Sequence, residues 1–153
     1  MTGEKINYVS MNTRLIYRIG CILICALSII CCSSSSISEY GKILSDKVIS
    51  VLSKDLESYD SIIIIPGTGC TGCIGNAERF FVQHVGDSRM LFILTGIVSR
   101  KNLEIKYRRS GFLERDNVMV DEKNIFYFPE FHDSIYPYRL MLKNGIIQKV
   151  KIL

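Results

Sequence analysis

The alternation of apolar and polar positions is clearest between residues 61 and 84. Four consecutive isoleucines, residues 62–65, end at Pro66. Because β-branched side chains suit a pleated strand and no polar residue interrupts them, this run predicts a strand that is buried on both faces. Apolar and aromatic residues then recur at intervals of three and four, which predicts a helix. They are Ile74, Ala77, Phe80, Phe81 and His84.

A further helix is predicted before this unit, and a strand and a helix after it. From Ile37 to about Leu56, apolar residues recur at helical spacing between charged ones, which is typical of a helix that covers one face of a sheet. Met90 to Leu94 is a second apolar run, and two strands joined by one helix favour a right-handed parallel crossover. Ser99 is a suitable N-cap for a helix that reaches about Arg109.

The last third of the chain predicts a short edge strand, a loop and a hairpin. Residues 118–120 are apolar, and a loop follows from Asp121 to His132. Two final apolar runs, residues 138–142 and 146–152, are separated by a turn that contains Asn144-Gly145. Asn-Gly is a strong hairpin signal because both turn residues must accept positive φ. These elements predict one α/β domain with a mixed sheet.

Cys70 and Cys73 stand at the turn between the buried strand and its helix. Unpaired N–H groups in a first helical turn and the helix dipole favour negative charge, so we expect Cys70 to ionise more easily than a free thiol. Cys73 lies about one turn further on, close enough to form a disulfide with Cys70. Such a pair is the minimum for dithiol–disulfide exchange. The alternative, a purely structural bridge, is weak because so small a loop removes little chain entropy.

Composition narrows the range of functions. The chain of 153 residues has a formal net charge of +4, and its basic residues form no stripe interleaved with aromatics, so we expect no nucleic-acid partner. The two histidines, His84 and His132, lack the paired spacing of structural zinc sites, and we predict no metal and no cofactor. Most simply, His84 is a helix-terminal residue, His132 is a solvated loop residue and Glu78 is a surface charge. Roles for His132 or Glu78 beside the dithiol are the alternative.

Residues 1–32 are interpreted as a leader rather than as part of the fold, with Met11 as an alternative start. Basic residues precede an apolar run at residues 19–30, which is the pattern of a secretory signal. Its end resembles a bacterial lipoprotein signal, with Cys32 as the preferred lipidated residue and Cys31 as the alternative. Both this interpretation and an uncleaved membrane anchor place the domain outside the cytoplasm, at the bacterial envelope, where disulfides persist.

The order of these features resembles the thioredoxin family, and within it the membrane-anchored thiol–disulfide oxidoreductases of bacterial envelopes. The resemblance covers about residues 60–153. It depends on the strand, Cys-x-x-Cys and helix, on a Tyr-Pro pair directly before a strand, and on the final Lys-Asn-Gly turn. It implies a thioredoxin-like three-layer sandwich at residues 59–153, with helices on both faces of a mixed sheet and a C-terminal β-hairpin. Residues 33–58 would form a serine-rich tether and the N-terminal helix.

The resemblance also implies roles for individual residues. Cys70 and Cys73 would exchange disulfides with protein or small thiol substrates and with an upstream envelope redox partner. Pro137 would be cis and lie against the dithiol, and Tyr136 would pair with an extended substrate through its backbone. The alternative is a thioredoxin-like lipoprotein that acts as a non-catalytic binding or assembly module.

Four departures from the family pattern bear on the chemistry. Gly69 stands where the family often has tryptophan, and Thr71-Gly72 replaces the commoner Gly-Pro between the cysteines. The isoleucine strand lacks the buried acid that many thioredoxins use to move a proton from the resolving thiol. A final helix that usually covers one sheet face is missing, so either the N-terminal helix covers more of the sheet or that face is left to a partner. The direction of electron flow is therefore left open.

Overall fold

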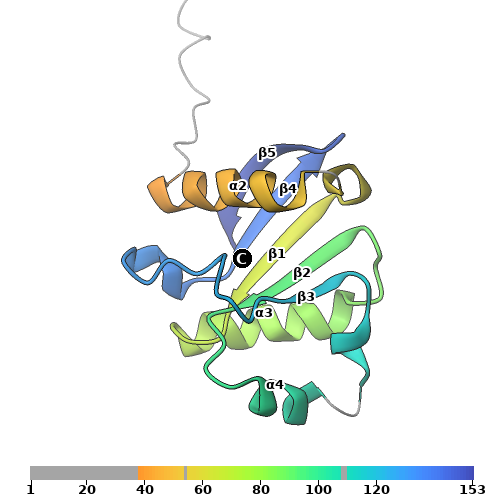
Figure 1. Cartoon of the computed structure of the whole chain (residues 1–153), viewed down its shortest axis with the longest axis vertical. Helices are drawn as coiled ribbons and strands as arrows, with labels where there is room; N and C mark the ends of the chain where they lie inside the picture. The colour runs from red at the N-terminus through yellow and green to blue at the C-terminus, as the bar shows by residue number, and fades with distance from the viewer. Residues whose placement is uncertain (1–37, 54, 108–109) are drawn as a thin grey trace, which may run out of the picture. The chain divides into compact units, whose positions relative to one another are not determined.

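A five-stranded mixed sheet forms the centre of the fold (Figure 1). The computed structural model describes residues 38–53, 55–107 and 110–153. The strands are β1 (Ser61–Pro66), β2 (Met90–Thr95), β3 (Val118–Val120), β4 (Tyr138–Lys143) and β5 (Ile146–Ile152). In the sheet they follow the order β3-β2-β1-β4-β5. The strands β1, β2 and β3 are parallel, β4 is antiparallel to β1, and β5 is antiparallel to β4.

Three α-helices in the described part of the chain cover this sheet. They are α2 (Glu39–Leu52), α3 (Thr71–His84) and α4 (Arg100–Tyr107). The buried side chains of α2 join one apolar cluster, and those of α3 and α4 join a second cluster on the opposite face of the sheet. The predicted α/β architecture with a mixed sheet is confirmed. Three short 3-10 helices, η2 (Leu56–Ser58), η3 (Phe112–Glu114) and η4 (His132–Ile135), lie in the connections.

The central strand β1 contributes to both apolar clusters. Ile62 and Ile64 belong to the cluster beneath α2, whereas Ile63 and Ile65 belong to the cluster beneath α3. None of the four side chains is more than 3% exposed. A strand buried on both faces needs an apolar side chain at every position, which explains why the uninterrupted isoleucine run occupies the centre of the sheet.

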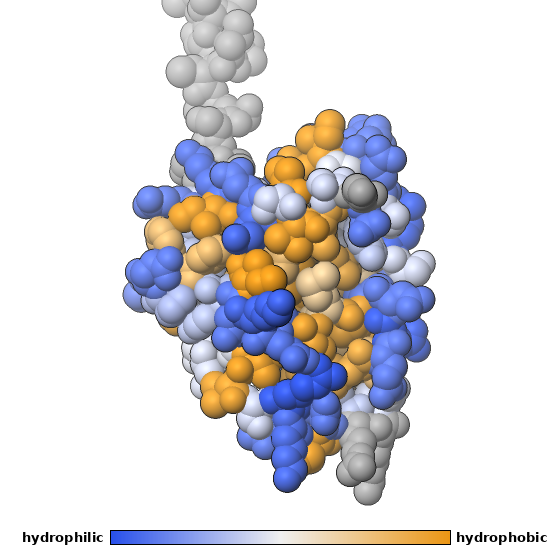
Figure 2. Space-filling model, in the orientation of Figure 1, coloured by the Kyte–Doolittle hydropathy of each residue, from blue (hydrophilic) through white to orange (hydrophobic). Residues whose placement is uncertain are grey.

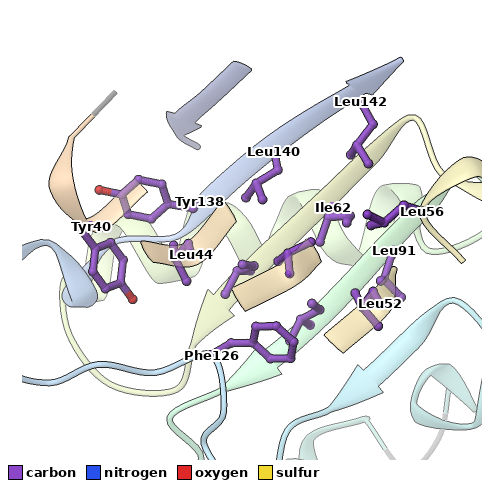
Figure 3. Close-up of a cluster of buried hydrophobic side chains, with 13 residues drawn as sticks. Tyr40, Leu44, Leu52, Leu56, Ile62, Leu91, Phe126, Tyr138, Leu140 and Leu142 are labelled. Atoms are coloured by element: carbon purple, nitrogen blue, oxygen red, sulfur yellow. The ribbon is translucent and has the colours of Figure 1, made fainter. Parts of the chain in front are cut away.

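The cluster beneath α2 is shown in Figure 3. One stripe of α2 faces the sheet and consists of Tyr40, Leu44, Val48 and Leu52. The loop after β3 adds Phe126, which is fully buried. The Tyr40 ring also packs against Tyr138, with 5.2 Å between the ring centroids. The periodic helix expected to cover one face of the sheet is therefore present.

The ends of α2 differ from the predicted range of residues 37–56. Ser38 is the N-cap, and its hydroxyl accepts a hydrogen bond from the N–H of Gly41 at 3.1 Å, so the helix begins at Glu39. After Leu52 the chain turns, with the N–H of Asp55 donating to the Leu52 carbonyl. Leu56 is buried, as its place in the apolar pattern requires, but it lies in η2.

The C-terminal hairpin confirms the prediction made from Asn144-Gly145. These residues have φ values of 53° and 74° and connect β4 to β5. The strand β4 alternates between buried and exposed positions, because its face toward α2 is covered and its opposite face is open. A register shift lies between Met141 and Leu142.

Asn117 is a buried polar residue that the apolar pattern did not reveal. Its side-chain amide lies within hydrogen-bond distance of the carbonyls of Val85, Asp87 and Met90, at 3.2, 3.0 and 3.0 Å. These three carbonyls belong to the end of α3, the following turn and the start of β2. Asn117 therefore fixes the return of the chain from α3 to the sheet.

The surface drawn in Figure 2 alternates between apolar and hydrophilic regions. Apolar side chains gather around the middle of this face, below the position of α2, and hydrophilic side chains border them. On α2 itself, Ile49 and Val51 are 47% and 43% exposed. Within the described ranges, no helix is both long enough and apolar enough to cross a membrane.

We predict that shortening Leu44 to alanine destabilises the fold. Leu44 is 0% exposed beneath α2, and Leu→Ala at such a site costs about 2–5 kcal/mol of unfolding free energy. Ile49→Ala, on the exposed side of the same helix, is the matched control and should change stability by less than about 1 kcal/mol. Urea unfolding followed by circular dichroism measures both. Equal effects would show that α2 does not pack on the sheet through Leu44.

Candidate redox site at the start of helix α3

Cys70 and Cys73 form a disulfide at the first turn of α3. Their Cα atoms are 5.3 Å apart, which lies within the normal range for a disulfide. Cys70 is the N-cap residue, and its sulfur accepts a hydrogen bond from the N–H of Cys73 at 3.4 Å. Both cysteines are only partly buried. The predicted pair is thus bonded, and α3 begins three residues earlier than the first residue of its apolar stripe.

The backbone of Cys70 is held by a residue far away in the sequence. Its N–H donates a hydrogen bond to the carbonyl of Ile135 at 3.2 Å. Ile135 is the last residue of η4, directly before the Tyr136-Pro137 pair. The resemblance predicted that this segment lies near the dithiol, but sequence reasoning missed Ile135 itself, because a backbone carbonyl leaves no trace in residue type.

Gly69 meets Ile135 at a point where no side chain fits. A Cβ atom added to Gly69 would lie 2.5 Å from the Ile135 carbonyl oxygen, and the φ of Gly69 is +138°. Gly67 is similarly close to the next loop, since its Cβ would lie 2.8 Å from the Gly96 carbonyl oxygen. Close backbone packing therefore requires glycine at position 69.

Tyr127 contacts the loop that joins β1 to the dithiol. Its phenol oxygen is 3.3 Å from the Thr68 hydroxyl. The ring also packs over Gly96, where an added Cβ would approach it to 3.1 Å. Tyr127 comes from the loop after β3, so this loop, the loop after β1 and the loop after β2 meet where the parallel strands end. Aromatic residues in that loop were the only sequence signal for this contact.

The loop that carries Tyr127 is fixed by Asp121. Its carboxylate is buried and accepts hydrogen bonds from the Thr95 hydroxyl at 2.7 Å and from the backbone N–H groups of Ile125 and Phe126 at 2.9 and 2.8 Å. The buried carboxylate therefore accepts three hydrogen bonds, and these bonds shape the loop. Its position directly after a predicted strand was the available signal, but the bonded turn could not be read from it.

Tyr136 and Pro137 lie at the entry to β4. Pro137 is buried and directly precedes Tyr138, which pairs with Ile64 of β1. Burial raises the pKa of the Tyr138 phenol above its ordinary value. Because Ile135 bonds to Cys70, the segment of Ile135 to Pro137 runs past the start of α3.

The expectation that Pro137 is cis is wrong. The described residues contain no cis peptide bond. Tyr136 has an extended backbone, with φ −101° and ψ 145°, which is the conformation that a residue before a trans proline prefers. Its N–H donates to the Asp133 carbonyl at 3.1 Å, closing the η4 turn. This turn already brings the Ile135 carbonyl to Cys70 with all peptide bonds trans.

The other polar candidates of the sequence analysis each have a contact with a neighbouring side chain. Glu78 forms an ion pair with Lys106, which joins α3 to α4. The side chain of His132 is 84% exposed, and its Nδ1 lies 3.8 Å from an Asp133 carboxylate oxygen. His84, in the last turn of α3, stacks on Phe80 with 4.2 Å between the ring centroids. The simpler interpretations of these three residues fit their surroundings.

Cys32, Cys31 and the proposed leader lie outside the described residues. Among the residues that are described, no group of three or more His, Cys, Asp or Glu side chains is arranged to hold a metal ion.

The fold and the site define an α/β protein with a five-stranded mixed sheet and a Cys-x-x-Cys disulfide at the start of a helix. This arrangement is compatible with a redox dithiol. No protein-family model, curated protein or solved structure among those compared matches the chain.

We predict that Gly69→Ala disrupts the site, whereas Gly72→Ala does not. The added Cβ at position 69 clashes with Ile135 and must adopt positive φ, so we expect a loss of at least about 1–3 kcal/mol of stability. At position 72 nothing lies within 4 Å of the added Cβ, and alanine favours a helix over glycine by about 0.5–1 kcal/mol. Urea unfolding of the two oxidised variants measures the difference. A stable Gly69→Ala variant would contradict the close contact with Ile135.

Proposed function

We propose that this protein is a thiol–disulfide oxidoreductase that exchanges disulfides through Cys70 and Cys73. The observation that carries the proposal is the position of Cys70 as the N-cap of α3, bonded to a second cysteine within the first turn. The unpaired N–H groups and the dipole of a helix start favour a thiolate over a thiol. Both cysteines are partly exposed, so a substrate sulfur can approach them.

The exchange takes two steps. In the reduced protein, the Cys70 thiolate attacks one sulfur of a substrate disulfide, which forms a mixed disulfide and releases the other substrate sulfur as a thiolate that takes up a proton. Cys73 then loses its proton and attacks the Cys70 sulfur. This closes the Cys70–Cys73 disulfide and releases the second substrate thiolate. Two electrons pass from the dithiol to the substrate, and the reverse sequence oxidises a substrate dithiol.

Thioredoxin-like features support this function. The strand β1, which is buried on both faces, leads into α3 and its cysteine pair. Pro137 directly precedes β4, the strand that is antiparallel to β1. The hydrogen bond from Cys70 to Ile135 holds the nucleophile against the segment that carries Tyr136 and Pro137. In this proposal that segment lines the substrate groove, and the backbone of Tyr136 pairs with an extended substrate.

The proposed site of action is the bacterial envelope. The basic residues and apolar run of residues 1–32 support export, with Cys32 as the lipid-bearing residue. An oxidising compartment suits a disulfide that must persist between catalytic cycles. An envelope redox partner then returns the dithiol to its starting state.

We predict different outcomes for the two cysteine variants. Both variants are made in a background in which the four N-terminal cysteines, Cys21, Cys25, Cys31 and Cys32, are replaced by serine, so that only Cys70 and Cys73 can react. Cys70→Ser should abolish reduction of a disulfide substrate in a coupled assay. Cys73→Ser should instead accumulate a mixed disulfide between Cys70 and the substrate, because the resolving thiol is absent. Mass spectrometry identifies the trapped cysteine.

The control for this experiment is equilibration of the Cys70–Cys73 pair with glutathione. A defined potential with complete interconversion supports exchange, and its value gives the direction of electron flow. Two results together would contradict the proposed enzymatic exchange: glutathione neither reduces nor reforms the Cys70–Cys73 disulfide, and Cys73→Ser forms no mixed disulfide. That outcome would favour the non-catalytic binding module.

A further inference from the structure

One face of β4 and β5 is not covered by any of the described helices. The helix α2 covers the face of β4 and β5 that carries Leu140 and Leu142. On the opposite face, α3 and α4 pack against β1 and β2 but leave β4 and β5 open. The helix α2 therefore does not replace a covering helix on that face. We call this uncovered surface of β4 and β5, beside α3, the open face.

The strand register identifies the side chains of the open face. Ile63 of β1 belongs to the cluster beneath α3 and pairs with Arg139, so Arg139 shares that side of the sheet. The remaining members follow from alternation along β4 and from pairing with β5. They are Met141, Lys143, Ile146, Lys149 and Lys151. Met141 is 37% and Ile146 is 64% exposed, and the three lysines are exposed as well.

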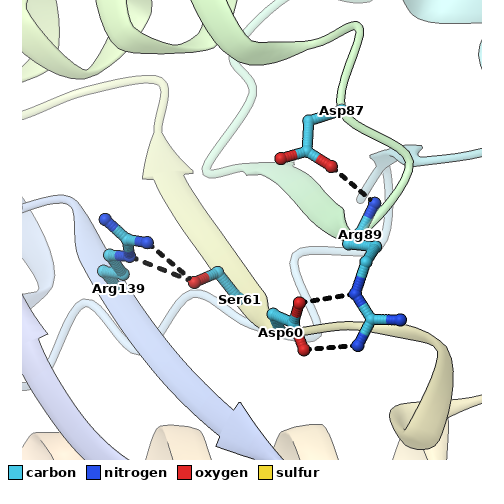
Figure 4. A network of polar contacts seen from close by, with 5 residues as sticks. All are labelled: Asp60, Ser61, Asp87, Arg89 and Arg139. Atoms are coloured by element: carbon cyan, nitrogen blue, oxygen red, sulfur yellow. Dashed lines mark hydrogen bonds and ion pairs between the residues drawn. The ribbon is translucent and has the colours of Figure 1, made fainter.

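The open face is strongly basic. It carries four cationic side chains, and residues 138–153 contain no Asp or Glu. No ion pair in the described part of the chain involves these four cations. Asp60, the acidic residue next to Ser61 in the sequence, accepts hydrogen bonds from Nε and Nη2 of Arg89, as Figure 4 shows. These hydrogen bonds hold the pKa of Asp60 below its ordinary value.

Arg139 is partly buried, and its side chain contacts Ser61 of β1 and Phe80 of α3. Its guanidinium donates to the Ser61 hydroxyl at 3.1 and 3.0 Å (Figure 4). The guanidinium carbon also lies 5.8 Å from the centre of the Phe80 ring of α3. Ser61 and Phe80 thereby fix one cation at the inner border of the open face. The outer cations are the lysines of β5.

The shape of the open face suits a helix. Two strands about 4.8 Å apart present a strip about as wide as an α-helix, which is roughly 10 Å across. The six residues of β4 extend about 20 Å, the length of a helix of about 13 residues. A helix laid there would complete the layer that α3 begins.

We propose that the open face docks an acidic amphipathic helix of a separate protein. The apolar stripe of that helix would cover Met141, and its carboxylates would pair with Arg139 and the lysines. The leader of this chain does not fit, because residues 1–36 contain more basic than acidic residues. A second copy is disfavoured by the net charge of +4. Docking does not depend on the dithiol chemistry.

The test uses the full chain and a fluorescein-labelled synthetic peptide of about 18 residues, with one leucine stripe flanked by glutamates on a helical pattern. Fluorescence anisotropy at physiological salt measures binding. We expect Lys149→Glu/Lys151→Glu to weaken binding at least about tenfold. The control, Lys101→Glu/Lys123→Glu, changes net charge equally at exposed positions outside the open face and should change affinity less than about twofold. Peptide helicity should rise on binding.

Several results would overturn the docking proposal. They are absence of peptide binding, equal weakening by both charge-reversal variants, and equal affinity for a peptide of the same composition with a scrambled stripe. Binding only to phosphatidylglycerol vesicles would assign the surface to a membrane instead. Cys70→Ser should leave peptide binding unchanged, so failure of the docking proposal and failure of dithiol exchange give separate readouts.

Discussion

The burial of β1 between two apolar layers is the constraint on which the site depends. Because isoleucines occupy both faces of this strand, helices must pack on both sides of the sheet, and the chain leaves β1 through a crossover rather than a hairpin. The crossover helix α3 therefore begins close to the C-terminal end of the central strand β1. Cys70 occupies that point as its N-cap. The position of the dithiol is thus a consequence of how the centre of the sheet is covered.

The surroundings of the dithiol come from close backbone packing among loops that are distant in the sequence. Glycine at position 69 lets the loop approach Ile135, whose carbonyl then holds the Cys70 N–H. The buried carboxylate of Asp121 shapes a third loop and brings Tyr127 to Thr68. The dithiol at the start of α3 and the open face of β4 and β5 are formed by different side chains. Chemistry and docking can therefore be separated by mutation.

The elements that depend on side-chain periodicity could be predicted from the sequence. Three sequence patterns each favour a single type of structure. They are the isoleucine run of β1, the apolar stripe of α2 and the Asn-Gly turn of the hairpin. The contacts that complete the site carry no such pattern, since the Ile135 carbonyl and the turn around Asp121 depend on backbone geometry. The spacing of one helical turn correctly predicted that the two cysteines can form a disulfide, whereas the resemblance to thioredoxins gave the wrong isomer for Pro137. The place of Arg139 on the open face required the strand register, because a shift of one residue would reverse every side chain of β4.

The central claim is that the start of α3 makes Cys70 acidic. The most direct measurement is the pH dependence of alkylation of Cys70 by iodoacetamide in the reduced protein, with the four N-terminal cysteines replaced by serine and the site identified by mass spectrometry. The account predicts a half-maximal rate at least about one pH unit below the free-thiol value of about 8.5, and a return to that value in urea. A folded protein in which Cys70 titrates at or above about 8.5 would contradict it.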